Sequence, residues 1–212
     1  MSRCRRRKSQ CGSPERRQRH EKDPFVRRAR SEGWRSRAAL KLEAVDQRDS
    51  LFRPGQTVVD LGAAPGGWCQ YAEQKVGAQG FVLGIDLLAI EPLPGVTLLQ
   101  EDFAADAGLE AVREALGGRE VDVVLSDMAP NLTGHSAVDQ PAAIGLAELA
   151  ADFAGQFLKR DGDFLVKVFH GEGFDAFRND LSQRFSRVLV RKPDASRAGS
   201  REVYLLARGP AV

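Results

Sequence analysis

Short apolar runs alternate along this chain with longer segments whose apolar residues recur at helical spacing. The short runs predict strands near residues 56–61, 81–86, 96–100, 121–126 and 163–169, then two late strands near 186–191 and 202–207. The longer segments predict helices near 35–46, 67–77, 107–116, 141–158 and 173–184. This alternation indicates an α/β fold, in which a mostly parallel seven-stranded sheet carries helices on both faces.

Length and composition limit the class of protein that the chain can be. The chain has 212 residues, enough for one domain with a real core, and no repeat or linker divides it. No apolar run approaches the roughly 18 residues of a membrane helix, so no membrane partner is expected. The three cysteines form no Cys-x-x-Cys pair, which suits a reducing cytoplasm. Cys4, Cys11 and His20 lack the spacing of a metal site, so no metal is expected.

The net charge of +2 conceals an uneven distribution. Residues 1–40 contain 14 Lys/Arg and 4 Asp/Glu, a charge of about +10, which leaves about −8 for the remainder. A basic segment on an acidic domain suggests a polyanionic partner, most simply nucleic acid. We therefore expect a disordered basic arm over residues 1–22 and a single domain over residues 23–212.

Two groups of basic residues could form such a surface, the first being the segment of residues 1–40. Arg35 and Arg37 lie one helical turn before Lys41 and are expected to hold RNA phosphates. A second basic group runs from Arg184 to Arg208. If the sheet brings these groups to one side, they form a continuous track for phosphates.

The segment Asp60–Trp68 (DLGAAPGGW) is the best candidate for a ligand site. It joins a predicted buried strand to a predicted helix. Such a glycine turn presents free backbone N–H groups at a helix N-terminus, against the carboxyl end of a sheet. Ala64 stands where a dinucleotide motif requires its second glycine, and the Gly-Lys-Ser/Thr end of a P-loop is absent. A ligand without phosphates, such as S-adenosylmethionine, therefore fits better.

Acidic residues follow the next predicted strands. Asp86 ends the second strand, where a carboxylate can accept hydrogen bonds from ribose hydroxyls. Asp102 follows the third strand and could meet the adenine amine. Both positions support an adenosine ligand at this edge of the sheet.

The fourth and fifth strands carry the candidate chemistry. Asp127 ends an apolar strand and should lie beside the ligand crevice. Lys167 interrupts a strongly apolar strand, where a lysine is costly to bury unless it is paired. An edge-strand lysine or a structural ion pair is the alternative to a functional lysine. Glu202 opens the last strand and could complete a charge network.

Other polar and aromatic residues have ordinary interpretations. His170 lies three residues beyond Lys167, and we expect a loop histidine bonded to backbone rather than a base. Trp34 could stack on a base or pack beneath the first helix. Tyr204 is expected in the core.

Several of these motifs together resemble the FtsJ/RlmE family of ribosomal RNA 2′-O-methyltransferases. The resemblance runs from about residue 24 onward, in the family's order and spacing. It rests on Arg35-Ser36-Arg37-Ala38, Lys41-Leu42, Asp60–Trp68, Ser126–Asn131, Val166–Gly171, Arg191-Lys192-Pro193 and Ser200–Tyr204. Ala39-Leu40 and His170 depart from the residues usual in the family.

The resemblance implies a Rossmann-like S-adenosylmethionine-dependent methyltransferase fold. It implies a catalytic set of Lys41, Asp127, Lys167 and Glu202. It implies S-adenosylmethionine contacts at Gly66, Trp68, Asp86, Asp102 and Asp127. The implied substrate is the 2′-hydroxyl of a uridine in the A-loop of 23S rRNA, within the large ribosomal subunit or its late precursor. A cytoplasmic monomer is expected.

The proposed reaction needs a ribose oxygen held in line with the sulfonium methyl group, at about 3–3.5 Å. A protonated hydroxyl is a poor nucleophile, so Lys167 is expected to act as base or to orient the hydroxyl. Asp127 would position Lys167 and the cofactor, while Lys41 and Glu202 would support the RNA side.

Three alternatives remain open at this point. A nicotinamide-dependent oxidoreductase could share the sheet, although Ala64 counts against it. An RNA-binding assembly factor without catalytic activity could share the fold, although the Lys41, Asp127 and Lys167 set counts against that. Within methyltransferases, tRNA is the competing substrate.

Overall fold

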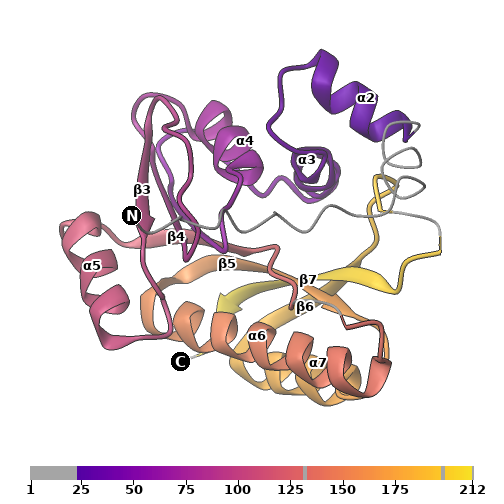
Figure 1. The fold of residues 1–212 in the computed structure, drawn as a ribbon. Helices are drawn as coiled ribbons and strands as arrows, with labels where there is room; N and C mark the ends of the chain where they lie inside the picture. Colours follow the sequence, from indigo (N-terminus) through magenta and orange to yellow (C-terminus); the bar gives the residue numbers. More distant parts are fainter. Residues whose placement is uncertain (1–22, 131–132, 197–198, 212) are drawn as a thin grey trace, which may run out of the picture.

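The computed structural model of the protein describes residues 23–130, 133–196 and 199–211 (Figure 1). Its strands form one seven-stranded sheet in the order β3-β2-β1-β4-β5-β7-β6. The strands are β1 (Thr57–Leu61), β2 (Phe81–Asp86), β3 (Val96–Gln100), β4 (Val121–Ser126), β5 (Leu158–Phe169), β6 (Phe185–Arg191) and β7 (Glu202–Pro210). The basic arm expected over residues 1–22 lies outside the described residues.

The last strand is the exception to parallel pairing. β7 runs antiparallel to its neighbours β5 and β6, whereas the other strand pairs are parallel. The prediction of a mostly parallel, seven-stranded sheet is confirmed. β5 begins at Leu158, earlier than the expected start near 163, because the polar residues after Leu158 hide the strand pattern. Its pairing with β4 is irregular there, with a shift of register between Val121 and Val123.

Helices cover both faces of the sheet (Figure 1). One face packs against α3 (Ala38–Asp49) and α4 (Gly67–Val76), and the other packs against α5 (Asp106–Leu116), α6 (Ser136–Phe157) and α7 (Phe174–Arg184). Successive strand residues point to opposite faces. Val58 and Val82 therefore pack toward α3 and α4, while Val59 and Leu83 pack toward the other helices. Lys167 has the same parity as Leu165, which lies on the α3 and α4 side.

A short helix that the sequence analysis did not predict, α2 (Pro24–Ser31), packs outside α3. Its arginines were interpreted as part of the basic segment, although Asp23 and Pro24 are residues typical of a helix start. The carboxylate of Asp23 accepts the amide of Phe25 at 3.0 Å, and Pro24 occupies the first turn.

Two helices begin at positions other than those expected. α3 begins at Ala38 rather than at 35, because Arg35–Arg37 form a connection that contacts other loops. α6 begins at Ser136 rather than at 141. Pro141 lies inside this helix, where it removes a backbone hydrogen bond without ending the helix.

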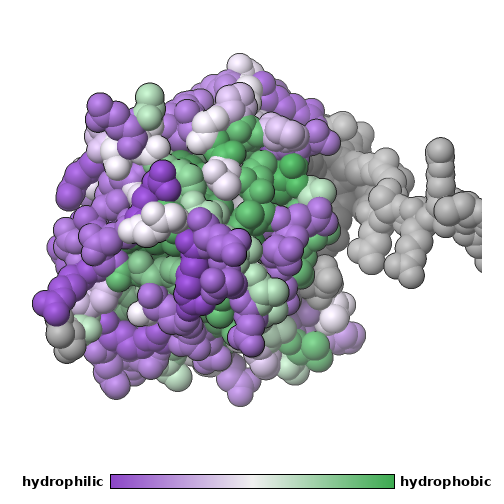
Figure 2. All heavy atoms as spheres, turned by 90° about the vertical axis from the view of Figure 1, so that its left-hand side faces the viewer, coloured by the Kyte–Doolittle hydropathy of each residue, from purple (hydrophilic) through white to green (hydrophobic). Residues whose placement is uncertain are grey.

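No helix within the described ranges is long and apolar enough to cross a membrane. Apolar patches interrupt a mainly polar surface on the side of the molecule that is at the left in Figure 1 (Figure 2). Of the exposed large apolar side chains, Leu87, Leu88 and Leu149 line the cleft described below. Their exposure is therefore consistent with a ligand site.

Candidate active site

The glycine turn after β1 opens toward a cleft at the carboxyl end of the sheet. Gly62 and Gly66 have φ values of 72° and 101°, a conformation that side chains rarely adopt. A Cβ atom at Gly62 would lie 2.2 Å from Cγ of Met128, so only glycine fits there. Gly66 caps α4, and the first amides of a helix have no partner within it. These amides are available to an anionic or polar ligand group.

Two adjoining cavities meet at this turn. The larger, of about 610 Å³, is lined by the predicted cofactor acids and by apolar side chains, namely Asp86, Asp102, Asp127, Leu87, Leu88, Phe103 and Met128 among others. The smaller, of about 170 Å³, lies against the start of α4 and includes Ser36, Asp60 and Trp68 in its lining. Gly62, Ala64 and Asp127 line both. The volumes and linings fit a ligand with an aromatic nucleoside and a small polar end.

The two strand-end acids take part in local backbone contacts. Asp86 accepts the amide of Ala64 at 2.9 Å and that of Leu88 at 2.8 Å, so it connects the glycine turn to the loop after β2. Asp102 accepts the amide of Ala104 at 3.0 Å. A carboxylate has about four lone-pair sites, so each acid can also accept hydrogen bonds from a ligand. Both side chains line the larger cavity, as the sequence predicted.

A buried carboxyl group, Asp60, lies at the base of the smaller cavity. Its side chain is 1% exposed and accepts the thiol of Cys69 at 3.2 Å. Burial, with the nearby carboxylates Asp127 and Asp86 adding to it, raises the pKa of Asp60 to about 7, although the Cys69 contact opposes the shift. Burial also raises the pKa of the Cys69 thiol. No individual role was predicted for Asp60 from the sequence.

Two lysine–carboxylate pairs lie close together, and one of them includes Asp127, which lines both cavities. Nζ of Lys167 lies 3.0 Å from Oδ1 of Asp127 and also donates to the Asp127 carbonyl. Nζ of Lys41 lies 2.7 Å from Oε1 of Glu202. Both lysine side chains are only 7% exposed. The structure thus brings together the four residues that the family resemblance implied, although they come from α3, β5, β7 and the end of β4.

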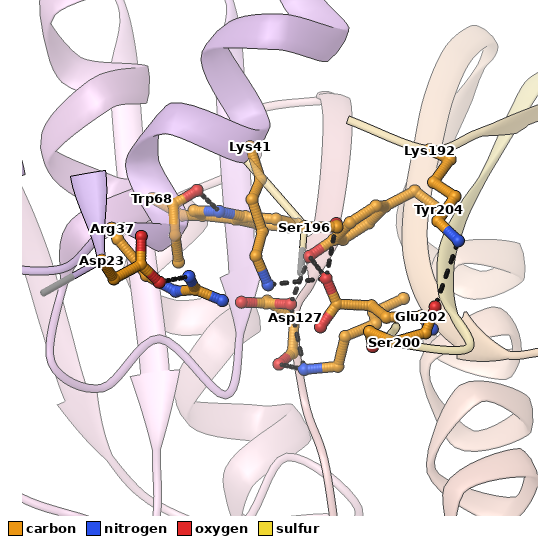
Figure 3. Close-up of polar contacts among 12 residues, drawn as sticks. Asp23, Arg37, Lys41, Trp68, Asp127, Lys192, Ser196, Ser200, Glu202 and Tyr204 are labelled. Carbon is orange, nitrogen blue, oxygen red and sulfur yellow. Dashed lines mark hydrogen bonds and ion pairs between the residues drawn. The ribbon is translucent and has the colours of Figure 1, made fainter. Parts of the chain in front are cut away.

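Tyr204 joins the two pairs (Figure 3). Its buried hydroxyl lies 2.9 Å from Oδ1 of Asp127 and 3.5 Å from Oε1 of Glu202. Nζ of Lys41 lies 5.8 Å from the centre of its ring. Burial, and the two carboxylates beside it, raise the pKa of the Tyr204 hydroxyl, so it stays protonated and can donate to either carboxylate.

Glu202 is held as a carboxylate. Burial alone would raise its pKa, but the Lys41 ammonium and the Ser196 hydroxyl, with a smaller contribution from Lys167, hold the pKa below its ordinary value. Oγ of Ser196 donates to Oε1 of Glu202 at 2.8 Å. The site therefore contains two ammonium groups compensated by two carboxylates.

The register of β5 and β7 creates this arrangement. Lys167 pairs with Tyr204, and Phe169 pairs with Glu202. In an antiparallel pair, residues directly opposite each other project to the same face. Lys167, Tyr204 and Glu202 therefore share the face that α3 covers, and the first turns of α3 bring Lys41 onto them. Because Glu202 and Tyr204 are two residues apart, their shared face was a signal for Tyr204 that the sequence analysis did not use.

The side chain of Trp68 has a structural position. Its Nε1 donates to the Ala38 carbonyl at 2.7 Å, and its ring centre lies 5.7 Å from that of Tyr204. The indole is buried, and Trp68 lines the smaller cavity, so what it offers to a ligand there is its backbone amide in the first turn of α4. Its predicted cofactor contact stays a prediction.

The two arginines before α3 are engaged within the protein. The guanidinium of Arg35 donates to three carbonyls, at 3.2 Å to Pro65, 2.6 Å to Glu91 and 2.7 Å to Pro92. Arg37 forms an ion pair with Asp23 (Figure 3). These contacts do not support the expectation that Arg35 and Arg37 hold RNA phosphates, and they give Arg35 a position from which it joins the glycine turn to the loop before β3.

The histidine beyond Lys167 does not belong to this cluster. His170 is exposed, its ring packs at 4.3 Å on Phe174, and its backbone amide donates to Arg201 at 2.9 Å. Within the part of the chain that the structure describes, no group of three or more His, Cys, Asp or Glu side chains is placed to bind a metal.

The fold and the cleft define a class of protein. The antiparallel last strand lies between β5 and β6, and a glycine turn and strand-end acids surround a cleft for a nucleoside. This is the architecture of a methyltransferase that uses S-adenosylmethionine. The lining fits this cofactor, because carboxylates face a cationic ligand and apolar side chains flank an aromatic base.

Comparison with known proteins identifies the family. The family described as FtsJ-like methyltransferase matches residues 34–210, and the chain belongs to this family. The chain is 76% identical, over the full length of both, to "Ribosomal RNA large subunit methyltransferase E" of Halorhodospira halophila. It is 59% identical to the protein of the same name from Alkalilimnicola ehrlichii, over 96% of this chain and 98% of that one.

A solved structure shares the fold. It is provisionally named as a ribosomal RNA methyltransferase of Plasmodium falciparum, and it is 27% identical to this chain with a TM-score of 0.76. The similarity covers 84% of this chain and 98% of the other. The fold and cofactor class expected from the sequence are confirmed.

Proposed function

We propose that this methyltransferase acts on the ribose 2′-hydroxyl of a uridine in 23S rRNA, in the A-loop, during maturation of the large ribosomal subunit. The names of its relatives support ribosomal RNA of the large subunit as the substrate. The single observation that carries a ribose oxygen as the acceptor is Lys167, buried and held by Asp127 at the edge of the cofactor cleft.

S-adenosylmethionine supplies the methyl group as a reactive sulfonium. The proposed catalytic set is Lys41, Asp127, Lys167 and Glu202. Asp127 lines both cavities and pairs with Lys167, so it links the cofactor side to the acceptor side. Lys167 would hold or accept the proton of the ribose hydroxyl. A ribose oxygen placed beside the lysine pair would be surrounded by fixed donors, which cost no reorganisation during the reaction.

The proposed cofactor contacts are Gly66, Trp68, Asp86, Asp102 and Asp127. The amides at the start of α4 suit the carboxylate of the methionyl group. Asp86 suits the ribose hydroxyls, and Asp102 suits the adenine amine, because both line the larger cavity. We further propose that residues 23–212 act as one catalytic domain, that residues 1–22 contact RNA, and that the enzyme acts as a cytoplasmic monomer without a metal.

The family assignment argues against the other candidates. An oxidoreductase would not need the paired lysines. An RNA-binding factor without catalytic activity would not need an intact cluster of two buried ion pairs, which are costly to maintain. Transfer RNA remains the second candidate substrate, because specificity among RNAs depends on shape and unpaired nucleotides.

The test is to map 2′-O-methylated nucleotides in RNA treated with the protein and S-adenosylmethionine. Large ribosomal subunits lacking the modification, free 23S rRNA and unmodified tRNA should be compared, with Lys167→Ala as the inactive control. We expect one uridine of 23S rRNA to be methylated by the wild-type protein. Methylation of tRNA alone would transfer the proposal to that substrate.

A further inference from the structure

The fold separates the basic residues that the sequence grouped between Arg184 and Arg208. Arg184 forms ion pairs with Asp152 and Asp180, at 3.0 and 3.4 Å. Arg208 lies 3.5 Å from Asp163, near the middle of β5. Each of these two guanidinium groups is paired with a carboxylate at a different place in the fold. Arg191, the last residue of β6, and Lys192, which follows it, lie next to α3.

A small cavity lies between α3 and the segment that follows β6. It has a volume of about 170 Å³ and is lined by Ala44, Val45, Arg48, Arg191, Lys192, Pro193 and Asp194. Three of these side chains are cationic and one is acidic. Its size suits a phosphate group rather than a nucleoside, and its lining contains no aromatic side chain.

Arg191 is fixed in this cavity. Its Nε and one Nη lie 2.7 Å from the two carboxylate oxygens of Asp49, and its other Nη donates to the Val190 carbonyl at 3.0 Å. The Arg191 guanidinium holds the pKa of Asp49 below its ordinary value, against the effect of burial. A guanidinium has five N–H donors, so these contacts leave two for a ligand. The fixed orientation reduces the entropy lost when a ligand binds.

The other two cations are more exposed. Arg48 lies in the last turn of α3 and is exposed, and it has no ion pair among the described residues. Lys192 donates to the Ser200 carbonyl at 3.1 Å, next to the strand that carries Glu202 (Figure 3). Asp194 and the Asp49 carboxylate oppose an anion, but the three cations outnumber these two acids.

The cavity shares a helix face with the catalytic set. Lys41, Ala44, Val45 and Arg48 are spaced three, four and seven residues apart, so they form one stripe along α3. At a rise of 1.5 Å per residue, Arg48 lies about 10 Å beyond Lys41 along the helix axis. Stacked nucleotides advance about 3.4 Å each, so a strand covers this distance in roughly three nucleotides.

We propose that the cavity formed by Arg48, Arg191 and Lys192 binds a backbone phosphate of the RNA, a few nucleotides from the ribose that is methylated. This inference rests on the proposed function, since it takes RNA as the substrate. The site positions the strand without reading a base, as phosphate contacts generally do. Free inorganic phosphate has the same chemistry, but only an RNA strand would occupy the cavity and the catalytic cleft together.

The test uses Arg48→Glu and Lys192→Gln in the full-length protein. The matched control is Arg160→Glu, an exposed arginine near the start of β5, at the opposite end of that strand from Lys167. Filter binding should measure the affinity for 23S rRNA across a salt series. Methyl transfer to large subunits should be measured in parallel, and S-adenosylmethionine affinity serves as the readout of intact folding.

We expect Arg48→Glu to weaken RNA binding by about tenfold and to reduce the salt slope by about 0.7, the value for one lost phosphate contact on a single strand. The KM for RNA should rise more than kcat falls, and cofactor affinity should not change. Lys192→Gln should show the same pattern to a smaller degree. Inorganic phosphate should compete more weakly with RNA in Arg48→Glu than in the wild type.

If Arg48→Glu and Arg160→Glu bind RNA alike, the phosphate site is wrong even when methyl transfer is normal. If the wild-type protein does not methylate 23S rRNA, the proposed function fails instead. In that case the RNA affinities of Arg48→Glu and Arg160→Glu still test the phosphate site, because binding is measured without methyl transfer.

Discussion

The ion pair between Lys41 and Glu202 allows stability and catalysis to be separated by a double-mutant cycle. The variants are Lys41→Met, which keeps the apolar stem over Tyr204, and Glu202→Gln, which keeps an oxygen that accepts from Ser196. Each single change leaves one buried charge without its partner, whereas the double variant leaves none. The pair therefore predicts partial rescue of stability in the double variant.

The expected magnitude follows from the burial of the pair. The two side chains are 7% and 13% exposed, and their charged atoms lie 2.7 Å apart. Breaking a buried pair from one side costs about 3–5 kcal/mol. Because Glu202 keeps contacts with Ser196 and Tyr204, we expect about 3 kcal/mol for each single variant, with a coupling energy of about 2 kcal/mol.

Urea unfolding without cofactor should give these free energies, and methyl transfer should be measured on the same samples. We expect the double variant to recover stability but not activity, if the pair has a direct role at the acceptor. The pKa of Glu202 is lowered in the folded protein, so the contribution of the pair is present above the ordinary value of 4.5 and is lost as the pH falls through the folded value. Additive free energies at pH 7.5, or activity restored together with stability, would refute this reasoning.

Three further predictions concern single residues. Lys167→Ala should abolish methyl transfer and keep S-adenosylmethionine binding, as measured by calorimetry; near wild-type turnover would make Lys167 a structural residue. Asp60 has a pKa raised from 3.8 to about 7, so its contribution to stability is full below 3.8 and declines as the pH rises toward 7. Asp60→Asn should remove this decline, which is roughly 1.4 kcal/mol for each pH unit between 3.8 and about 7. If the free energy of unfolding changes equally in the variant and the wild type between pH 5 and pH 8, this prediction is wrong. Arg35→Ala should weaken S-adenosylmethionine binding by about tenfold, the loss of roughly one hydrogen bond to a charged group, with RNA affinity unchanged; the opposite pattern would return Arg35 to a phosphate-binding role.

The elements of the fold were predictable because apolar spacing alone distinguishes buried strands from amphipathic helices. The boundaries were less so, as α2 and the early start of β5 show. In α2, arginines concealed a helix that begins with a clear cap at Asp23. In β5, Leu158 pairs with Val121 of β4, and the polar residues that follow Leu158 conceal this early start.

The candidate site was predictable where strand ends determine it. Asp86 ends its strand and Asp102 and Asp127 follow theirs, and parallel strands place such residues at one edge of the sheet. Contacts that depend on strand pairing or on loops distant in the sequence could not be predicted from the sequence. The bridging position of Tyr204 needs the pairing of β5 with β7, and the three carbonyl contacts of Arg35 need two loops that are distant in the sequence.

The place of β7 in the sheet has a consequence for how the enzyme folds. β7 follows β6 in the chain, yet it lies between β5 and β6. Until it inserts, these two strands expose unpaired edges, and such edges promote aggregation. Its pairing with β5 also closes a long loop, which slows folding. Because β7 carries Glu202 and Tyr204, folding intermediates that lack it also lack a complete catalytic cluster, and the appearance of activity during refolding should report the insertion of this strand.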